Sequence, residues 1–135
     1  MPLFEWKPLY SVGIALVDGQ HQKLIGCMNS FHEAQAAGKA AAAKLELAAL
    51  LRFTKIHFTD EEGMMQRNGY PDFPAHQAAH HKLLEIVEKL AKTYMEAPTP
   101  ANGEKMGNFL KTWLANHILG IDKKYSPFMH EHGVA

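Results

Sequence analysis

The sequence predicts an all-α protein: an antiparallel up-down-up-down four-helix bundle with an irregular N-terminal arm. Four long segments carry apolar side chains three and four residues apart, which is typical of amphipathic helices. Stretches rich in glycine and proline separate these segments, and short links favour antiparallel neighbours. No segment has the alternating pattern of a half-buried strand. We therefore expect one domain of 135 residues, with the arm over residues 1–18, the bundle over 19–125 and a tail over 126–135.

The arm and the first helix are separated by a change of pattern near Asp18. Two prolines and Gly13 interrupt any helical period before that point. The first helix is predicted to begin at residue 18 or 19, with Asp18 as its N-cap, and to end before Gly38. Its inward stripe is predicted to consist of His21, Leu24, Ile25, Met28 and either Phe31 or His32.

Three further helices are predicted over residues 40–67, 73–95 and 104–125. The segment Asn68-Gly69-Tyr70-Pro71 is a strong stop after the second helix. Pro74 is compatible with the first turn of the third helix. The stretch over 97–103 contains two prolines and a glycine and predicts a loop, and Pro127 is expected to end the fourth helix.

Composition excludes several classes of function. Fourteen basic and fourteen acidic side chains cancel, so nothing indicates a nucleic-acid partner. No run of about 18 apolar residues predicts a membrane span. The N-terminus does not resemble a signal peptide, so we expect a cytoplasmic protein. A lone Cys27 is expected to be a small buried hydrophobe, and polar outer helix faces favour a monomer.

Nine histidines are the most unusual feature of the composition. Each predicted helix directs at least one ligand-capable side chain inward, and two pairs are four residues apart, which places both members on one helical face. A buried polar group without a partner costs about 1–3 kcal/mol, so such a cluster inside a bundle predicts a metal site. The candidate ligands are His21, His57, Glu61, His76, His80, His117 and Asp122.

Neighbouring residues compete for two of these positions. Glu61 is preferred to Glu62, and His80 to His81, because a spacing of four keeps the face of the first ligand. Asp122 follows His117 by five residues, which rotates it away by about 140° on a regular helix. We therefore predict a local π-type distortion near Gly120, a feature that often marks functional sites.

The ligand types indicate the metal. Imidazole suits iron, zinc, copper or nickel, and seven ligands exceed one tetrahedral zinc site. Paired carboxylate-bridged sites in bundle cores hold two iron or two manganese ions, and the excess of nitrogen ligands favours iron.

These residues resemble the hemerythrin family, specifically its single-domain bacterial members, the bacteriohemerythrins. The matching segments occur in family order and extend over essentially the whole chain: residues 18–22 (DGQHQ), 57–62 (HFTDEE), 76–80 (HQAAH), 113–117 (WLANH) and 122–125 (DKKY). The resemblance implies that His76, His80 and His117 bind one iron and that His21 and His57 bind the other. Glu61 and Asp122 would then bridge the two ions, together with a solvent-derived oxo or hydroxo group.

The ligand count that follows leaves one iron with six ligands and the other with five. Dioxygen is therefore expected at the iron of His21 and His57, bound reversibly by a carrier, storage or delivery protein and not by an enzyme. Neutral imidazoles outnumber carboxylates, which disfavours the high-valent iron of oxidases. Candidate walls of the oxygen pocket are Leu24, Ile25, Trp113 and Leu114.

Other functions stay open from the sequence. A di-iron enzyme acting on peroxide or nitrogen oxides, an oxygen or redox sensing partner, a metal-storage module and a purely structural bundle are the alternatives. An oxygen-consuming enzyme is a possible recipient of the oxygen. His32, His81, His130 and His132 are expected on the surface or in the tail.

Overall fold

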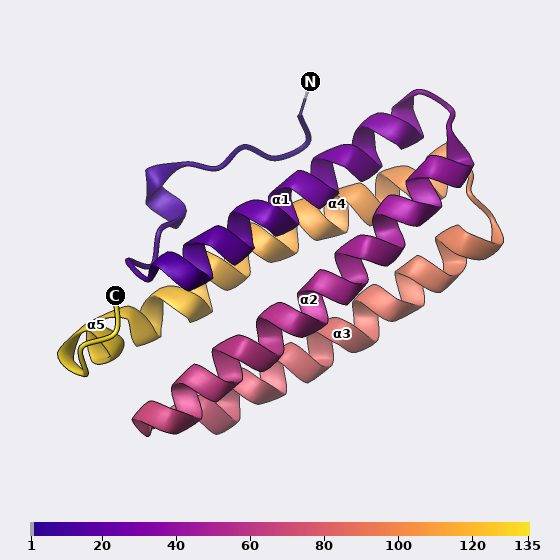
Figure 1. Cartoon of the computed structure of the whole chain (residues 1–135). Coiled ribbons are helices and arrows are strands. Elements are labelled where there is room, and N and C mark those ends of the chain that lie inside the picture. The colour runs from indigo at the N-terminus through magenta and orange to yellow at the C-terminus, as the bar shows by residue number, and fades with distance from the viewer. Residues whose placement is uncertain (1) are drawn as a thin grey trace.

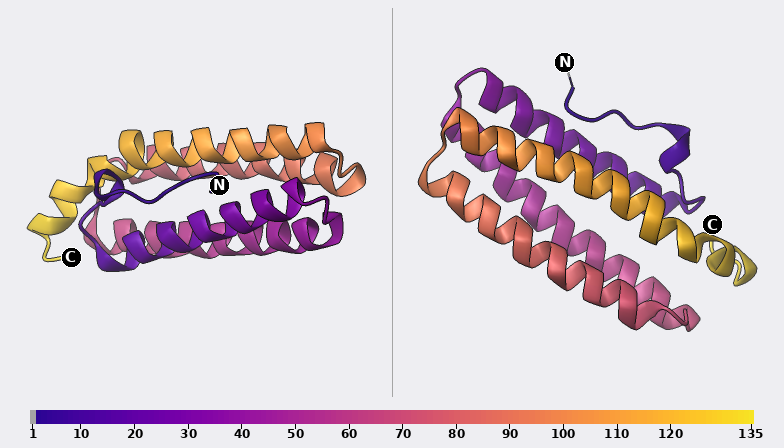
Figure 2. Two further views of the ribbon diagram at one scale, coloured as in Figure 1. Left: turned by 90° about the horizontal axis from the view of Figure 1, so that it is seen from above. Right: turned by 180° about the vertical axis from the view of Figure 1, so that it is seen from behind.

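The computed structural model describes residues 2–135 and confirms the predicted all-α class. Four long antiparallel helices form the bundle, and Figure 2 shows the first two as one layer and the next two as the other. A π-helical segment follows the fourth helix and leads into a fifth helix, which is labelled α5 in Figure 1. Their bounds are α1 Ala15–Ala36, α2 Ala40–Asn68, α3 Phe73–Glu96, α4 Pro100–His117, η2 Ile118–Asp122 and α5 Lys123–Glu131.

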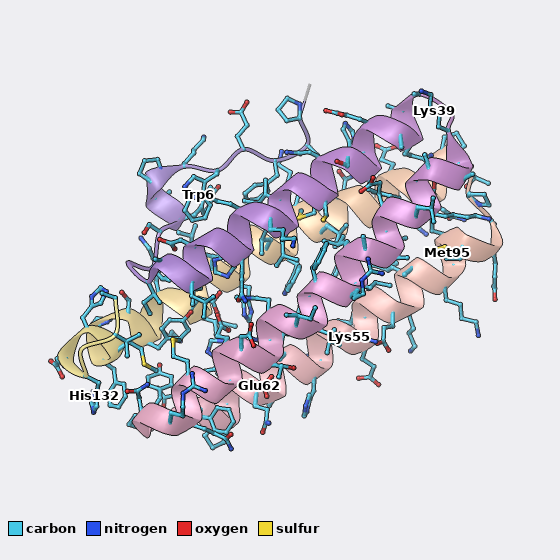
Figure 3. All side chains as sticks on the ribbon, viewed as in Figure 1. Trp6, Lys39, Lys55, Glu62, Met95 and His132 are labelled. Atoms are coloured by element: carbon cyan, nitrogen blue, oxygen red, sulfur yellow. The ribbon has the colours of Figure 1, made fainter. Side chains whose placement is uncertain are left out.

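The core differs between the two ends of the bundle. The α1–α2 and α3–α4 connections share one end, which we call the connection end; Lys39 and Met95 mark it in Figure 3, and His132 marks the opposite end. The half of the bundle at the connection end is filled by buried apolar side chains, among them Phe31, Leu47, Leu50, Tyr94 and Met106. Buried polar side chains gather in the other half, so the same bundle contains a dry core and a site.

Helix α1 begins earlier than predicted, at Ala15, and Asp18 is not its N-cap. The Asp18 carboxylate instead accepts hydrogen bonds from the Val12 backbone N–H, at 2.9 Å, and from the Ser11 hydroxyl. An acidic side chain in the first turn of a helix also suits the helix dipole. Asp18 therefore ties the arm to α1.

Helix α4 also begins earlier than predicted, at Pro100 instead of residue 104. Thr99 is the N-cap, and its hydroxyl accepts a hydrogen bond from the Asn102 backbone N–H at 3.2 Å. Pro100 occupies the first turn, where its missing N–H has no cost. Pro100, one of the two prolines that predict a loop, is therefore the first residue of a helix.

The expected tail from residue 126 is wrong, because α5 continues through Pro127 to Glu131. A proline inside a helix removes one hydrogen bond and costs about 3 kcal/mol. Tyr125 and Met129 on either side of it are fully buried. Burying each of these large side chains contributes about 1.5–3 kcal/mol, which offsets the cost of the proline.

The N-terminal arm lies along the bundle beside α1 and α4 (Figures 1 and 2). The Asn29 side chain pairs with both backbone groups of Phe4, at 2.9 and 2.8 Å. Near α5, the Ser126 hydroxyl donates to the Val12 carbonyl at 2.6 Å. Residues 2–14 are irregular apart from one turn of 3-10 helix over Pro8–Tyr10, whereas residues 15–18, which were expected in the arm, belong to α1.

Within residues 2–135, no helix combines the length and the apolar character that crossing a membrane requires.

Candidate metal centre

Seven buried side chains converge in the half of the bundle opposite the connection end. They are the seven that the sequence predicts, and none is more than 3% exposed: His21, His57, Glu61, His76, His80, His117 and Asp122. Helix α1 supplies one, α2 two, α3 two, α4 one and the π segment η2 one. Every layer of the bundle therefore contributes, and the site lies between all four long helices.

The side chains form two overlapping groups, in each of which one possible ligand atom per residue lies within 4.8 Å of all the others. One group contains His76, His80 and His117, and the other contains His21 and His57. Glu61 and Asp122 belong to both groups. We call these groups the three-histidine position and the two-histidine position.

Each carboxylate points one oxygen at each position. Oε1 of Glu61 lies 2.8 Å from His76 Nε2 and 3.0 Å from His80 Nε2, whereas Oε2 lies 3.4 Å from His57 Nε2. This division is the arrangement that a bridging carboxylate needs, because each oxygen then faces a different ion.

Asp122 repeats this division with its own two oxygens. Its Oδ1 is 3.0 Å from His117 Nε2, and its Oδ2 is 3.1 Å from His21 Nε2. Two different helical segments thus place the two carboxylates between the same pair of positions.

The π segment explains how Asp122 reaches the site. A residue five positions after His117 lies about 140° away on a regular helix, at about 100° per residue. The wider turn over Ile118–Asp122 accommodates one additional residue and returns Asp122 toward the face of His117. The predicted distortion near Gly120 is therefore present. Gly120 itself is not forced by space, since a Cβ there would meet no atom within 4 Å.

Unsatisfied polar atoms indicate that these residues fit a metal. Both Asp122 oxygens and the Nε2 atoms of His80 and His117 are buried without a hydrogen-bond partner. Two ligand atoms that each lie about 2.1 Å from one ion, at right angles, are about 3 Å apart. The 2.8–3.4 Å separations between carboxylates and imidazoles have that size.

Charge supports the same conclusion. Among residues 2–135, only histidines lie within ion-pair distance of Glu61 and Asp122. Two fully buried carboxylates without a lysine or arginine need another source of positive charge, since burying an unpaired ion is costly. Bound metal cations would supply that charge.

The pKa values of the carboxyl groups match a ligand role. Burial and the nearby Asp122 raise the pKa of Glu61, whereas His57, His76 and His80 lower it. The lowering effects are larger, so the pKa of Glu61 is below its usual range. Burial also raises the pKa of Asp122, while His117 and two other histidines bring it well below normal. Both groups are therefore ionised at neutral pH, as metal ligands must be.

Two histidines have pKa values shifted in opposite directions. Burial lowers the pKa of His57 to about 4, even though Glu61 opposes this shift. Burial would also lower the pKa of His76, but the adjacent carboxylates of Asp122 and Glu61 raise it to about 9. In the metal-free protein, His76 therefore carries a proton that a metal ion would replace.

Residues beyond the predicted set orient the histidines. His57 Nδ1 lies 2.6 Å from Gln20 Oε1, and the Gln20 amide donates to Asp60 at 2.7 Å. His80 Nδ1 lies 3.1 Å from Glu62 Oε2. In the sequence Glu62 is only a rival to Glu61 for the ligand position, but in the structure it lies behind His80. Its position five residues after His57 indicates that it faces a different neighbour than Glu61 does, but does not identify that neighbour.

Apolar residues surround the centre. The predicted pocket residues Leu24, Ile25, Trp113 and Leu114 are all buried. Sequence reasoning missed Phe58, whose ring stacks on His80 at 3.7 Å between centroids. An apolar groove of about 390 Å³ between α3 and α4 is lined by Trp113 and His117, among others.

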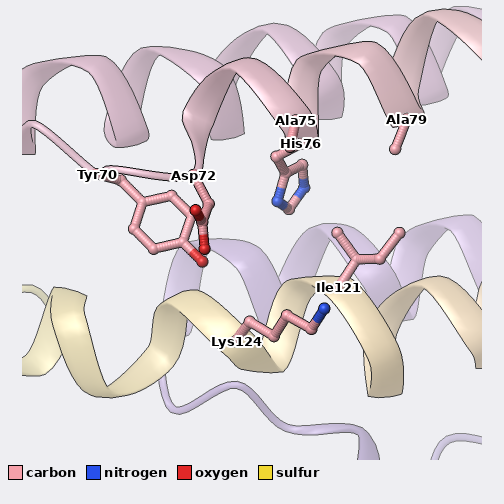
Figure 4. Close-up of a pocket in the computed structure, with 7 residues that line it drawn as sticks. All are labelled: Tyr70, Asp72, Ala75, His76, Ala79, Ile121 and Lys124. Atoms are coloured by element: carbon pink, nitrogen blue, oxygen red, sulfur yellow. The ribbon is translucent and has the colours of Figure 1, made fainter.

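A second groove of about 370 Å³ reaches His76 (Figure 4). Lys124, Tyr70 and Asp72 line it beside the imidazole. The three-histidine position is therefore close to two surface grooves.

The remaining predictions concern residues away from the centre. His81 and His130 are exposed as expected, and His130 Nε2 donates to the Gly13 carbonyl at 2.9 Å. His132 is exposed, whereas His32 is half-buried. Cys27 is only partly buried, and burial raises the pKa of its thiol, so it has little thiolate character.

Comparison with known proteins gives consistent matches. The model of the hemerythrin HHE cation binding domain matches residues 12–129. A bacteriohemerythrin of Methylococcus capsulatus is 33% identical over 128 residues, covering 94% of this chain and 97% of that protein. A myohemerythrin of Riftia pachyptila is 31% identical over 122 residues, covering 90% of each chain. These relatives are named as hemerythrins and not as enzymes.

Solved structures agree in fold. A crystal structure of wild-type hemerythrin has a TM-score of 0.84 and 32% sequence identity, covering 93% of this chain and 96% of that one. A crystal structure of a hemerythrin mutant has a TM-score of 0.85, covering 94% and 97%.

Proposed function

This chain belongs to the hemerythrin family, and from that premise we propose that it binds dioxygen reversibly at a non-haem, carboxylate-bridged pair of iron ions. The observation that supports the proposal most directly is the unequal division of histidines between two positions that share Glu61 and Asp122. Three imidazoles serve one position and two serve the other, so one ion is left a ligand short.

The proposed roles follow the two positions. His76, His80 and His117 would hold one iron, and His21 and His57 would hold the other. Glu61 and Asp122 would serve both ions as shared ligands, together with an oxo or hydroxo group derived from solvent. When bound, the iron pair supplies the electrons that dioxygen accepts on binding and returns on release.

The protein's own residues favour reversibility in two ways. Five imidazoles are neutral ligands and only two carboxylates add negative charge, so the donor set gives less support to high-valent iron than a carboxylate-rich site does. Leu24, Ile25 and Leu114 are buried about one helical turn along the chain from His21 or His117, and the Phe58 ring stacks on His80. We propose that these apolar walls keep water from the bound oxygen and so slow irreversible oxidation.

Anaerobic reduction of the iron-loaded protein, followed by air, tests the proposal. We expect two iron ions per chain and a visible charge-transfer band that appears with oxygen and disappears when oxygen is removed. The variant His80→Ala should lose this band. The neighbouring variant His81→Ala is a matched control, because His81 is exposed, and it should keep the band.

Two outcomes would contradict the proposal. A fully loaded protein with one metal ion per chain would exclude the paired site. Continuous oxygen consumption in the presence of a reductant would instead indicate an enzyme acting on oxygen, peroxide or nitrogen oxides. A cytoplasmic location, a monomeric state and an oxygen-consuming enzyme as recipient stay predictions.

A further inference from the structure

One buried hydroxyl group contacts the bridging carboxylate without being a metal ligand. The Tyr125 hydroxyl donates a hydrogen bond of 2.8 Å to Oε2 of Glu61. Tyr125 is fully buried, so this bond is shielded from solvent. We propose that Tyr125 is the positioning residue that holds Glu61 in its bridging orientation, and that the two-histidine position depends on it.

The two oxygens of Glu61 are not equally supported. Oε1 faces two histidines, with His76 at 2.8 Å and His80 at 3.0 Å. Oε2 faces only His57, at the longer distance of 3.4 Å. Among residues 2–135, Tyr125 supplies the one hydrogen bond that Oε2 receives. Without it, only the longer contact with His57 would keep Oε2 directed at the two-histidine position, while His76 and His80 would still hold Oε1.

The Tyr125 ring is fixed by its neighbours. It stacks on His76, with 5.6 Å between centroids and 27° between planes, and meets Tyr70 edge to face at 6.2 Å. The hydroxyl therefore cannot swing away from Glu61 without displacing a proposed ligand. A rigid donor suits a positioning role, since tightly held outer groups orient metal ligands.

The π segment also sets the register of Tyr125. On a regular helix, Tyr125 would lie about 80° from the face of His117, eight residues earlier. The additional residue accommodated over Ile118–Asp122 turns the following chain back by about 100°. Asp122 and Tyr125 then both lie within about 40° of that face. One distortion thus delivers a bridging carboxylate and the residue that positions the other.

The inference rests on the proposed function and predicts unequal loss of metal. Removing an outer partner of a metal ligand commonly lowers affinity by about 10- to 100-fold. In Tyr125→Phe, the metal affinity of the two-histidine position should fall by about tenfold or more. The metal affinity of the three-histidine position should change by less than about threefold, because Oε1 of Glu61 keeps its contacts with His76 and His80.

Stepwise titration of the metal-free protein with Co²⁺ under anaerobic conditions tests the inference. Calorimetry and visible absorption follow the two equivalents, and electron paramagnetic resonance follows magnetic coupling between the ions. Wild-type protein should bind two coupled ions. Tyr125→Phe should bind the first ion as before and the second more weakly. The control Tyr94→Phe removes a hydroxyl from another fully buried tyrosine, which bonds to Gln35, and should bind both ions normally.

A further variant protects the test against simple misfolding. Para-aminophenylalanine at position 125 retains a hydrogen-bond donor and should restore the second step that phenylalanine weakens. Equal weakening of both steps in Tyr125→Phe, an unchanged second step, or failure of the amino variant to restore it would overturn the inference. Fewer than two ions on the wild-type protein would instead overturn the proposed function itself, and this inference with it.

Discussion

The imidazole of His80 is held by neighbours on both sides. Its Nδ1 faces the Glu62 carboxylate at 3.1 Å, and the Phe58 ring stacks on it. The Gln77 amide donates to the other Glu62 oxygen at 2.9 Å and so keeps that carboxylate in place. A carboxylate behind a ligating imidazole fixes the ring orientation and increases its basicity.

Replacing this carboxylate should weaken metal binding without removing a ligand. We expect Glu62→Gln to lower metal affinity by about tenfold, as is usual for outer partners of metal ligands. Competition with a coloured chelator measures the affinity. Glu85→Gln is the matched control, because Glu85 is an exposed carboxylate on α3. Identical affinities in the two variants would show that Glu62 has no such role.

The stability of the metal-free protein should be greatest near neutral pH. The pKa of folded His57, about 4, is below its ordinary 6.5, so stability falls as the pH drops from 6.5 toward 4. The pKa of folded His76, about 9, is above 6.5, so stability falls as the pH rises from 6.5 through 9. Depressed carboxyl pKa values add to the loss in acid.

Thermal unfolding at a series of pH values measures this dependence. The thermal unfolding midpoint of the metal-free protein should fall by about 5 °C or more on the acid and the alkaline side of the pH of maximum stability. In the metal-loaded protein the alkaline decline should disappear, because the ion replaces the proton on His76. A metal-free protein with a flat alkaline side would contradict the raised pKa of His76.

At the scale of the helices, the π segment and not its glycine places Asp122. Gly120 is exposed and a Cβ there meets no neighbour, so Gly120→Ala should keep two metal ions per chain. It should also raise stability by about 0.5–1 kcal/mol, since alanine loses less entropy in a helix. Metal analysis and chemical denaturation measure both effects.

An alanine inserted between Gly120 and Ile121 gives the opposite expectation. It rotates Asp122 and Tyr125 by about a further 100° and should reduce metal binding to one ion or none. An inserted alanine after Glu131, beyond the last helix, is the control. Normal metal content in the first insertion would mean that the helix register does not determine the site.

Helical periodicity predicts the interior of the elements better than their ends. The ligand positions follow from spacing because residues four apart share a face, and even the distortion before Asp122 was predictable from its spacing of five. The early start of α4 depends on the Thr99 cap, and the continuation of α5 depends on burial of Met129. Tertiary contacts decide such ends, and sequence alone does not contain them.

Contacts between helices account for the functional residues that sequence reasoning missed. Tyr125 is 64 residues from Glu61 in the chain, and Gln20 is 37 residues from His57. No local spacing connects such pairs. Glu62 was visible as a neighbour of Glu61, but its contact with His80 on the next helix required the packed structure.

For the whole molecule, metal removal should lower stability substantially. Binding to the folded state alone adds about 4 kcal/mol when the free metal is a thousandfold above its dissociation constant. For a chain of this size, that corresponds to a fall of about 10–20 °C in the unfolding midpoint on chelation. Calorimetry with and without a chelator measures it. A shift below about 2 °C would indicate that the buried carboxylates are satisfied without metal.

The uneven core should determine which end of the bundle opens when metal ions are exchanged. Phe31, Leu47 and Tyr94 are fully buried at the connection end, where none of the candidate metal ligands lies, so the packing of this end does not depend on a cation. A chain stripped of metal is then expected to fray from the opposite end while these residues stay packed. Amide hydrogen exchange should increase around residues 57–61 and 117–125 and stay slow around 31 and 47. The bundle would thereby release and rebind iron through partial opening. The connection end would stay folded throughout and would guide the refolding of the half that contains the site.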